Sequence, residues 1–360
     1  MAARVRSEII RRHSLGGGRI SLSQDVYTAL VRRLGRRYVE QRLRIEEDHE
    51  AQVFGQGINF FHFENWYSSP WLIRNTLRLA GLYRRGLENA KRVELLKNEF
   101  ALARLPKAFD GLTILHISDM HVDMNPGAMQ SLMEMVATLD YDICVLTGDY
   151  RGQTTGPFEA TLDGLARIRR YLDDPVYAVL GNHDTIRMVP GLEDLGIRVL
   201  VNECETLSRG DQELHLGGID DAHYFRAENI EKVAGEIPTG AFSVLLSHTP
   251  EIYRQAASAE FDLLLAGHTH GGQICLPGSI AITLDSVLPR RMGSGAWGYG
   301  SMTGYTSAGV GSSIVPVRFN CPPTITLHSL HCRSPLVGPV AQPHREQHAR
   351  EHDLAGAEQH

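Results

Sequence analysis

The chain has 360 residues, of which 42% are hydrophobic and 22% are charged, and its formal net charge is -6. This length and composition suit one sizeable α/β domain with an addition. No stretch of the sequence approaches the apolar length that a membrane-spanning helix needs, and residues 1–20 lack the apolar core of a signal peptide. The five cysteines form no C-x-x-C pair, which favours buried thiols in a reducing compartment. We therefore expect a cytoplasmic protein that is not secreted and does not cross a bilayer.

Charge divides the chain into two unlike segments. Residues 1–107 contain 20 Lys and Arg against 11 Asp and Glu, which gives +9, and the remaining residues contain 16 against 31, which gives -15. A helical pattern rich in arginine begins at Ser23, and an amphipathic run extends from Leu72 to Leu102. We predict a basic, mostly helical N-terminal extension over residues 1–107, an α/β domain over residues 108–332 and a disordered tail over residues 333–360.

Two interpretations of the N-terminal extension stay open. Six aromatic residues lie close together between Phe60 and Trp71, after a basic helical segment. Basic helices with aromatic side chains can lie in the interface of an anionic membrane. Apolar helix faces also pack onto neighbouring domains. The sequence is compatible with a membrane role for some of these helices and a packing role for others.

Strands and helices are predicted to alternate from residue 108 onwards. Apolar runs of strand length are separated by stretches with helical periodicity, a pattern that favours a layered α/β fold. The predicted strands cover residues 112–118, 143–147, 176–180, 242–246 and 261–266. The predicted helices cover residues 127–139, 157–172, 228–235 and 250–258. The run 112–118 is rich in β-branched residues and is expected to be a buried strand.

Each of these predicted strands is followed by residues of types that commonly bind metals, namely Asp, Asn or His. Several of these residues follow a glycine, which lets the backbone come close to a bound ion. Asp119 and His121 stand two residues apart, so an extended backbone points both to the same side. The residues concerned are Asp119, His121, Asp149, Asn182, His183, Asp184, His248, His268 and His270. Because α/β sheets carry their chemistry at the carboxyl ends of strands, these residues are candidates for one site.

The ordered motifs D-x-H, G-D, G-N-H, H and G-H-x-H resemble the signature of the calcineurin-like metallophosphoesterase superfamily, over about residues 108–330. The resemblance implies a four-layer α/β/β/α sandwich, here with an N-terminal helical extension. It also implies two metal ions that share Asp149. One ion is then held by Asp119, His121, Asp149 and His270, and the other by Asp149, Asn182, His248 and His268.

The residue types support such a centre independently. Imidazole, carboxylate and amide ligands suit Mn²⁺, which we expect first, and also Fe²⁺ or Zn²⁺, whereas a structural zinc site would include cysteine. Two such ions can clamp a phosphate and share a hydroxide that attacks phosphorus. His183 is the candidate proton donor to the leaving group. Asp184 either orients the His183 ring or caps a helix.

The segments around residues 297–300 and 307–330 resemble a subgroup with membrane-associated members, some of which cleave the pyrophosphate of UDP-2,3-diacylglucosamine in lipid A biosynthesis. The function predicted is therefore hydrolysis of a phosphodiester or pyrophosphate, on a substrate that can be lipid-linked, with peripheral attachment to the inner membrane face. Cyclic-nucleotide or other small phosphodiesterases, and a metal-free scaffold, are the alternatives; no nucleic acid partner is expected. Contact with the substrate is one interpretation of Asp221, His223 and Arg318, but solvated positions are expected for all three.

Overall fold

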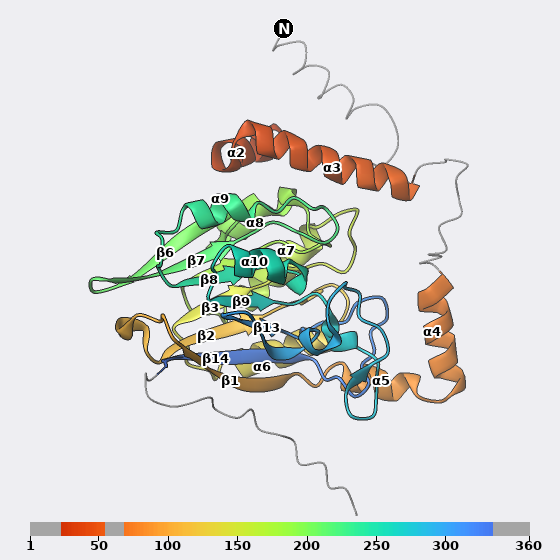
Figure 1. The fold of residues 1–360 in the computed structure, drawn as a ribbon. Coiled ribbons are helices and arrows are strands. Elements are labelled where there is room, and N and C mark those ends of the chain that lie inside the picture. Colours follow the sequence, from red (N-terminus) through yellow and green to blue (C-terminus); the bar gives the residue numbers. More distant parts are fainter. Residues whose placement is uncertain (1–22, 55–67, 334–360) are drawn as a thin grey trace, which may run out of the picture.

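The structure, a computed structural model, describes residues 23–54 and 68–333 (Figure 1). The aromatic residues from Phe60 to Tyr67, the first 22 residues and almost all of the predicted tail lie outside the described residues. In the part of the chain that the structure describes, no helix combines the length and the hydropathy that a membrane crossing requires.

Two six-stranded sheets form the centre of the described domain. The first sheet has the strand order β1 (Glu94–Leu102), β14 (Thr324–Cys332), β2 (Leu112–Ile117), β3 (Ile143–Leu146), β4 (Val176–Ala178), β5 (Ile197–Val199). The second has the order β12 (Gly295–Tyr299), β13 (Met302–Thr306), β9 (Leu263–Ala266), β8 (Ser243–Leu246), β7 (Gln212–Gly218), β6 (Glu203–Arg209). Strands β2 to β5 are parallel, and so are β7, β8, β9 and β13.

Three apolar layers show that the sheets pack face to face with helices outside. In β2, Ile114 lies in the layer between the sheets, whereas Leu115 faces the helices that cover the first sheet. In β9, Leu263 lies in that same middle layer and Leu264 faces the helices of the second sheet. This alternation is what a strand buried on both faces requires. The predicted α/β/β/α sandwich is confirmed.

Helices cover the outer face of each sheet (Figure 1). The first sheet is covered by α6 (Pro126–Val136), α7 (Glu159–Arg169) and α8 (Val189–Asp194), and the second by α9 (Ile230–Gly235) and α10 (Tyr253–Ser258). Asn125 and Asn229 begin α6 and α9 by accepting a hydrogen bond from a backbone N–H of the first turn, as N-cap residues do. The predicted helices agree with these elements to within a few residues, although residues 250–252 form a short 3-10 turn before α10.

Strand β1 corrects the prediction for residues 72–102. This amphipathic run belongs to an extension that is expected to be mostly helical, but residues 94–102 form a strand that pairs with β14 in parallel register. Phe100 and Leu102 are buried in the layer between the two sheets. The last part of the predicted extension is therefore an integral strand of the first sheet.

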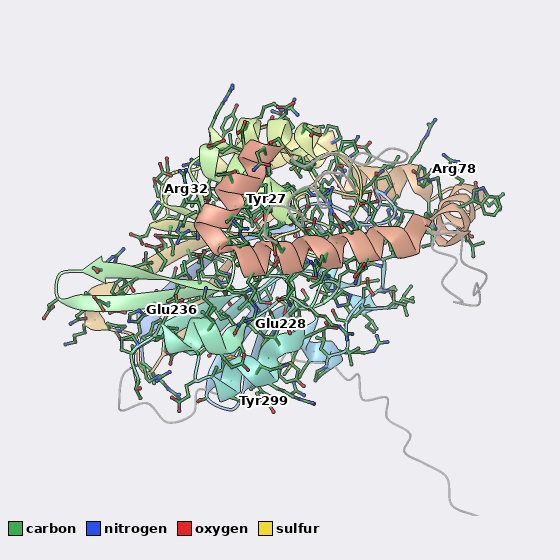
Figure 2. The ribbon with its side chains drawn as sticks, turned by 90° about the horizontal axis from the view of Figure 1, so that it is seen from above. Tyr27, Arg32, Arg78, Glu228, Glu236 and Tyr299 are labelled. Carbon is green, nitrogen blue, oxygen red and sulfur yellow. The ribbon has the colours of Figure 1, made fainter. Side chains whose placement is uncertain are left out.

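The helices of the extension differ in how they contact the domain. Helices α2 (Gln24–Leu34) and α3 (Arg36–Phe54) bury Leu30 and Val39 in the apolar layer of the first sheet. Seen from above, α3 crosses the top of the domain, and Arg78 of α4 (Ser68–Leu79) projects at its edge (Figure 2). Helix α5 (Tyr83–Asn89) contacts the domain through Gly86, whose carbonyl accepts from the N–H of Arg318. For α2 and α3, packing onto the domain is what the contacts show.

Candidate metal centre

The candidate ligands lie in loops that follow the carboxyl ends of five strands. Because β2, β3 and β4 are parallel neighbours in one sheet, and β8 and β9 in the other, their ends meet at one edge of the sandwich. Asp119 and His121 follow β2, Asp149 follows β3, Asn182 follows β4, His248 follows β8, and His268 and His270 follow β9. The structure brings all seven side chains together.

The first cluster contains Asp119, His121 and His270, all of them buried. The Nε2 atoms of His121 and His270 lie 3.1 Å apart. Nε2 of His270 lies 3.6 Å from a carboxylate oxygen of Asp119. One ligand atom from each residue falls within 4.8 Å of the others. Three donors that converge at this distance could hold a single ion.

The second cluster contains Asp149, His248 and His268, which are buried as well. Nε2 of His248 lies 3.4 Å from Oδ2 of Asp149 and 3.2 Å from Nδ1 of His268. The Oδ1 atom of Asn182 lies 2.8 Å from Nε2 of His248 and 2.9 Å from Nδ1 of His268. Asn182 thus adds a fourth donor to this cluster.

Asp149 lies between the two clusters. The same oxygen, Oδ2, is 3.4 Å from Nε2 of His248 in the second cluster and 3.8 Å from Nε2 of His121 in the first. A carboxylate oxygen within reach of both donor sets is suited to bridge two cations.

Three of the histidines are oriented by backbone carbonyls on the outer side of the centre. Nδ1 of His121 lies 2.7 Å from the carbonyl oxygen of Arg151, and Nδ1 of His248 lies 2.8 Å from that of Thr147. The Nε2 atom of His268 lies 2.7 Å from the carbonyl oxygen of Asp285. A ring N–H donated to a carbonyl leaves the other nitrogen bare and aimed inwards, as metal ligation requires.

Five of the seven candidate ligands have a left-handed backbone. The φ angles are 52° at Asp119, 39° at His121, 56° at Asp149, 71° at His268 and 49° at His270. Non-glycine residues adopt this conformation rarely, and such strain concentrates at functional sites. Strand β2 ends at Ile117, so the expectation that Asp119 and His121 share one side of an extended strand is wrong. A tight turn, and not strand periodicity, directs both side chains into the centre.

Burial and mutual charge set the protonation of the centre. Burial alone would raise the pKa of Asp149, but the charges of His248 and His183 outweigh it and hold that pKa well below the usual range. Burial raises the pKa of Asp119, and the charge of Asp149 adds to this effect. Burial lowers the pKa of His268 to about 3. A neutral imidazole beside two buried carboxylates is a donor set that favours cations.

His183 and Asp184 have different surroundings. His183 points its ring towards the centre: Nε2 lies 3.9 Å from Oδ2 of Asp149, and Nδ1 lies 3.2 Å from the hydroxyl of Thr154. The carboxylate of Asp184 accepts hydrogen bonds from the backbone N–H groups of Asp149, Tyr150 and Gly181. It therefore ties the loop after β3 to the loop after β4. Neither predicted role, orienting the His183 ring or capping a helix, matches these contacts.

Three residues near the centre, Asp221, His223 and Arg318, were expected to be solvated rather than to contact the substrate. Arg318, expected at the surface, is fully buried and donates to the carbonyls of Ala308, Gly309 and Gly311 beside His270. Its burial results from tertiary packing, and no local pattern in the sequence predicts it. Asp221, expected in a solvated loop, is also buried.

His223 is the third of these residues, and it borders the centre. Its ring lies 4.2 Å from the ring of His268, and its Nδ1 lies 2.8 Å from a carboxylate oxygen of Glu251. The side chain is about one quarter exposed, so it borders the centre from the solvent side. The G-I-D-D-A-H segment after β7 was the available signal, because it also places acidic and imidazole groups at a strand end.

The sequence resembles those of known proteins. Residues 112–272 match the model of the calcineurin-like phosphoesterase family. An uncharacterized metallophosphoesterase of Aquifex aeolicus is 31% identical over 240 residues, which cover 62% of this chain and 86% of that protein. The chain belongs to the calcineurin-like metallophosphoesterase family. It is therefore a phosphoester hydrolase, with candidate ligands for two divalent metals.

Two further relatives of this metallophosphoesterase carry descriptive names. Phosphodiesterase YaeI of Escherichia coli is 28% identical over 200 residues, which cover 52% of this chain and 70% of YaeI. A transmembrane protein with metallophosphoesterase domain from Danio rerio is 29% identical over 208 residues, and the chain spans 47% of its length. These names describe those two proteins.

Proposed function

We propose that this protein hydrolyses a phosphodiester or pyrophosphate bond at a centre of two divalent metal ions. The observation that carries the proposal is the position of one Asp149 oxygen between two converging donor sets. Asp119, His121, Asp149 and His270 would hold one ion, and Asp149, Asn182, His248 and His268 the other. A metal-free scaffold of the same fold would have no reason to keep a complete donor set.

The donor types favour Mn²⁺, with Fe²⁺ or Zn²⁺ as alternatives, because they combine imidazole with hard oxygen ligands and no thiolate. When bound, the ions supply Lewis acidity and a water of lowered pKa. Other residues of the chain position the candidate ligands and transfer the proton. Asp184 keeps the loops after β3 and β4 at a fixed spacing through backbone hydrogen bonds, so that Asp149 and Asn182 stay in register.

We assign to His183 the transfer of a proton to the leaving oxygen. Its ring faces the carboxylate of Asp149 without belonging to either donor cluster. The contact between Nδ1 and the Thr154 hydroxyl fixes the ring plane and leaves Nε2 facing the centre. A side chain with these contacts can reach a substrate held at the centre, as a general acid must.

A lipid-linked substrate is the finer part of the proposal. YaeI supports a phosphodiester by its name, and the Danio rerio relative supports a membrane setting by its own. UDP-2,3-diacylglucosamine combines a pyrophosphate with acyl chains and is the first candidate. Cyclic nucleotides and small phosphodiesters are the alternatives. The protein would act at the cytoplasmic face of the membrane.

Helix α4 supports peripheral membrane attachment. Trp71 is 65% exposed and Leu79 is 91% exposed, which is unusual for large apolar side chains on a helix. Arg78 and Arg85 are exposed on α4 and α5 and would face anionic head groups. An apolar edge with flanking arginines is the pattern of a helix that lies in a membrane interface.

A substrate panel tests the reaction. The chelated protein is reloaded with Mn²⁺ and offered bis(p-nitrophenyl) phosphate, a cyclic nucleotide, a phospholipid head-group ester and UDP-2,3-diacylglucosamine. We expect Mn²⁺-dependent hydrolysis of at least the first compound, and the highest kcat/KM for the lipid-linked pyrophosphate. No hydrolysis of any compound, with metal bound, would contradict the reaction; a preference for the cyclic nucleotide would contradict only the lipid assignment.

Flotation with anionic liposomes tests attachment. Replacing Trp71 and Leu79 with alanine removes the apolar edge of α4 and should release most of the bound protein. The matched control replaces Tyr171 and Leu96, which are also exposed but lie on other parts of the domain. If both double variants float like the unaltered protein, α4 is not the attachment surface. A chain cut at Lys107 is unsuitable here because it lacks β1.

A further inference from the structure

Helix α3 contacts two loops that border the candidate metal centre. The first, residues 182–187, contains Asn182 and His183. The second, residues 219–227, carries His223, whose ring lies 4.2 Å from His268. The two loops come from different sheets, and α3 forms hydrogen bonds to both of them. A single helix of the extension thus touches the surroundings of both donor clusters.

Arg42 of α3 is the main anchor on the second loop. It is fully buried, and its Nε lies 2.8 Å from a carboxylate oxygen of Asp220, which is buried too. Its guanidinium lies 3.7 Å above the ring of Phe225, and Nη1 lies 2.8 Å from Glu46. Nη2 also reaches the carbonyl of Asp184 at 3.5 Å. A buried charge is strongly destabilising without its partners, so this contact holds both loops in one arrangement.

Glu46, one turn further along α3, anchors the first loop. Its carboxylate accepts a hydrogen bond of 2.6 Å from the hydroxyl of Thr185 and one of 2.8 Å from the N–H of Ile186. These residues follow the candidate ligand Asn182 by only three and four positions. Charge-assisted hydrogen bonds to a backbone N–H are among the stronger ones in proteins. The end of this loop is therefore fixed by α3.

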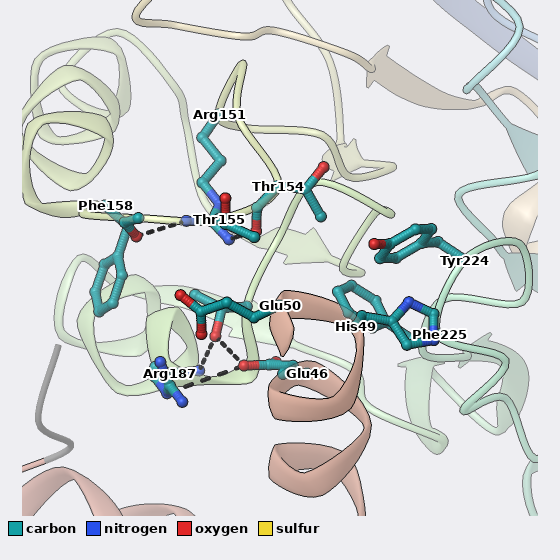
Figure 3. Close-up of a pocket in the computed structure, with 12 residues that line it drawn as sticks. Glu46, His49, Glu50, Arg151, Thr154, Thr155, Phe158, Arg187, Tyr224 and Phe225 are labelled. Atoms are coloured by element: carbon teal, nitrogen blue, oxygen red, sulfur yellow. Dashed lines mark hydrogen bonds and ion pairs between the residues drawn. The ribbon is translucent and has the colours of Figure 1, made fainter. Parts of the chain in front are cut away.

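A cleft lies between α3 and these loops (Figure 3). The space in it that the centre of a water-sized molecule can occupy is about 40 Å³, and the cleft is open to solvent. His49 and Glu50 of α3 line one side, and Thr154, Arg187 and Tyr224 line the others. The Thr154 hydroxyl joins this cleft to the centre, because it also contacts the His183 ring at 3.2 Å.

We propose that α3 is a working part of the active site, with Arg42 and Glu46 as positioning residues and the cleft as the subsite for the leaving group. This inference rests on the proposed function, because it assigns a place to the group that His183 would protonate. The lining has carboxylate, guanidinium, imidazole and hydroxyl groups, with only the rings of Phe158, Tyr224 and Phe225 as apolar surface. Such a lining suits a polar leaving group that presents hydroxyl or amino groups and excludes a hydrocarbon chain.

Arg42→Met and Arg33→Met form a matched pair for the positioning role. Arg33 also anchors the extension, with Nε 3.0 Å from Glu193 and a second ion pair to Glu203, but it touches neither loop. Glu46→Gln is a milder variant that keeps the size of the side chain. It weakens the contacts to Thr185 and Ile186 and removes the charge that pairs with Arg42 and Arg187. This variant tests the positioning role if Arg42→Met does not fold. Arg42→Lys restores the charge without the planar fork.

Hydrogen exchange measures positioning without any substrate. In the full chain, Arg42→Met should raise exchange at least tenfold in residues 219–227 and 182–187, and Glu46→Gln should do so at Ile186. Arg33→Met should leave both loops protected, and Arg42→Lys should recover part of the protection. Equal exchange in the Arg42 and Arg33 variants would overturn the positioning role, whether or not the protein hydrolyses phosphoesters.

Kinetics with two methyl phosphodiesters, one of glycerol and one of hexanol, test the cleft. Release of each alcohol is measured for the unaltered protein and for the double variant His49→Ala, Glu50→Gln. We expect a preference for the glycerol ester that falls at least tenfold in the variant, mainly through KM. Gln41→Ala, an exposed change on the same helix, is the control. Hydrolysis of both esters with an unchanged preference would sink the subsite and leave the proposed function intact; hydrolysis of neither would count against the proposed function itself.

Discussion

His183 shows how a residue next to a ligand acquires a separate role. It follows Asn182 directly, yet its side chain faces Asp149 across a distance of 3.9 Å and joins neither donor cluster. The backbone N–H of His183 donates a hydrogen bond of 2.9 Å to Oδ1 of Asp149. The backbone of His183 therefore orients the bridging carboxylate, while its ring remains available to substrate.

Replacing His183 with asparagine separates these two contributions. The backbone hydrogen bond to Asp149 is retained, so metal content should not change. Loss of the general acid should lower kcat by about 10²–10⁴-fold. Turnover and bound metal are measured on the same preparation. Loss of metal together with activity would show that the ring belongs to the ligand set.

Buried histidines elsewhere make stability depend on pH. His116 in β2 and His328 in β14 lie 3.3 Å apart through ring nitrogens and are both buried. Burial lowers the pKa of His116 to about 3 and holds that of His328 well below its usual value, with His116 adding to the second shift. In the unfolded chain both rings take up protons near their ordinary pKa of about 6.5. Stability that is present above this pH is therefore lost as the pH falls below it.

Urea unfolding at pH 7 and pH 5 measures this effect. A ring that stays neutral when folded should contribute a loss of about 2 kcal/mol between these two conditions. Replacing His116 with asparagine should reduce the difference between the two conditions by roughly that amount. His331→Asn, at a partly exposed position of β14, is the control. An unchanged difference in the His116 variant would mean that this ring is protonated in the folded protein.

Strand β1 is the element on which the sequence misleads most. Its exposure pattern leaves only Phe100 and Leu102 buried, because β1 is an edge strand of the first sheet. The alternation that identifies a half-buried strand is missing from its first residues, where Leu95 and Leu96 are adjacent. The central strands, buried on both faces, are continuous apolar runs and are predictable for that reason.

Two alanine substitutions test whether β1 is an integral part of the sheet. Phe100 is 5% exposed and stacks on His328 with ring centroids 5.3 Å apart, so Phe100→Ala should cost about 3–5 kcal/mol. Leu96→Ala, at a 40% exposed position of the same strand, should cost less than about 1 kcal/mol. Chemical denaturation gives both values. Similar small losses at the two positions would indicate that β1 is detached in solution.

The loops of the centre depend on glycines that follow strands. A Cβ at Gly267 would lie 1.8 Å from Oγ of Ser118 and 2.4 Å from Oδ2 of Asp119. These glycines are visible in the sequence, and the candidate ligands are recognised because they directly follow them in the motifs G-D, G-N-H and G-H-x-H. The sequence does not show the left-handed turns of Asp119 and His121, because those depend on contacts with the opposite sheet, such as Asp119 with the N–H of His268.

At the scale of the whole molecule, the described helices α2 and α3 and strand β1 of the extension pack together with the domain. Charge composition separates residues 1–107 from the rest, and the helical pattern that begins at Ser23 predicts α2 and α3. It does not predict their docking, because Arg42 is one of many arginines in the sequence and its partner Asp220 lies 178 residues away. Buried ion pairs between distant segments are decided by tertiary packing and leave no local signal.

The arrangement of the two sheets explains why one site collects residues from so many parts of the chain. Each sheet ends in loops at the same edge, and the first sheet supplies Asp119, His121, Asp149 and Asn182 while the second supplies His248, His268 and His270. One side-chain oxygen of Asp149 lies 3.8 Å from Nε2 of His121 in the first donor set and 3.4 Å from Nε2 of His248 in the second. We therefore propose that this single carboxylate joins two cation sites across the interface of the sheets.

Elemental analysis after removal of metal and reloading with Mn²⁺ tests this claim most directly. The unaltered chain should bind about two ions, and Asp149→Asn should bind fewer than one while remaining folded. Two ions retained in the Asp149 variant, or none bound by the unaltered chain, would contradict the account.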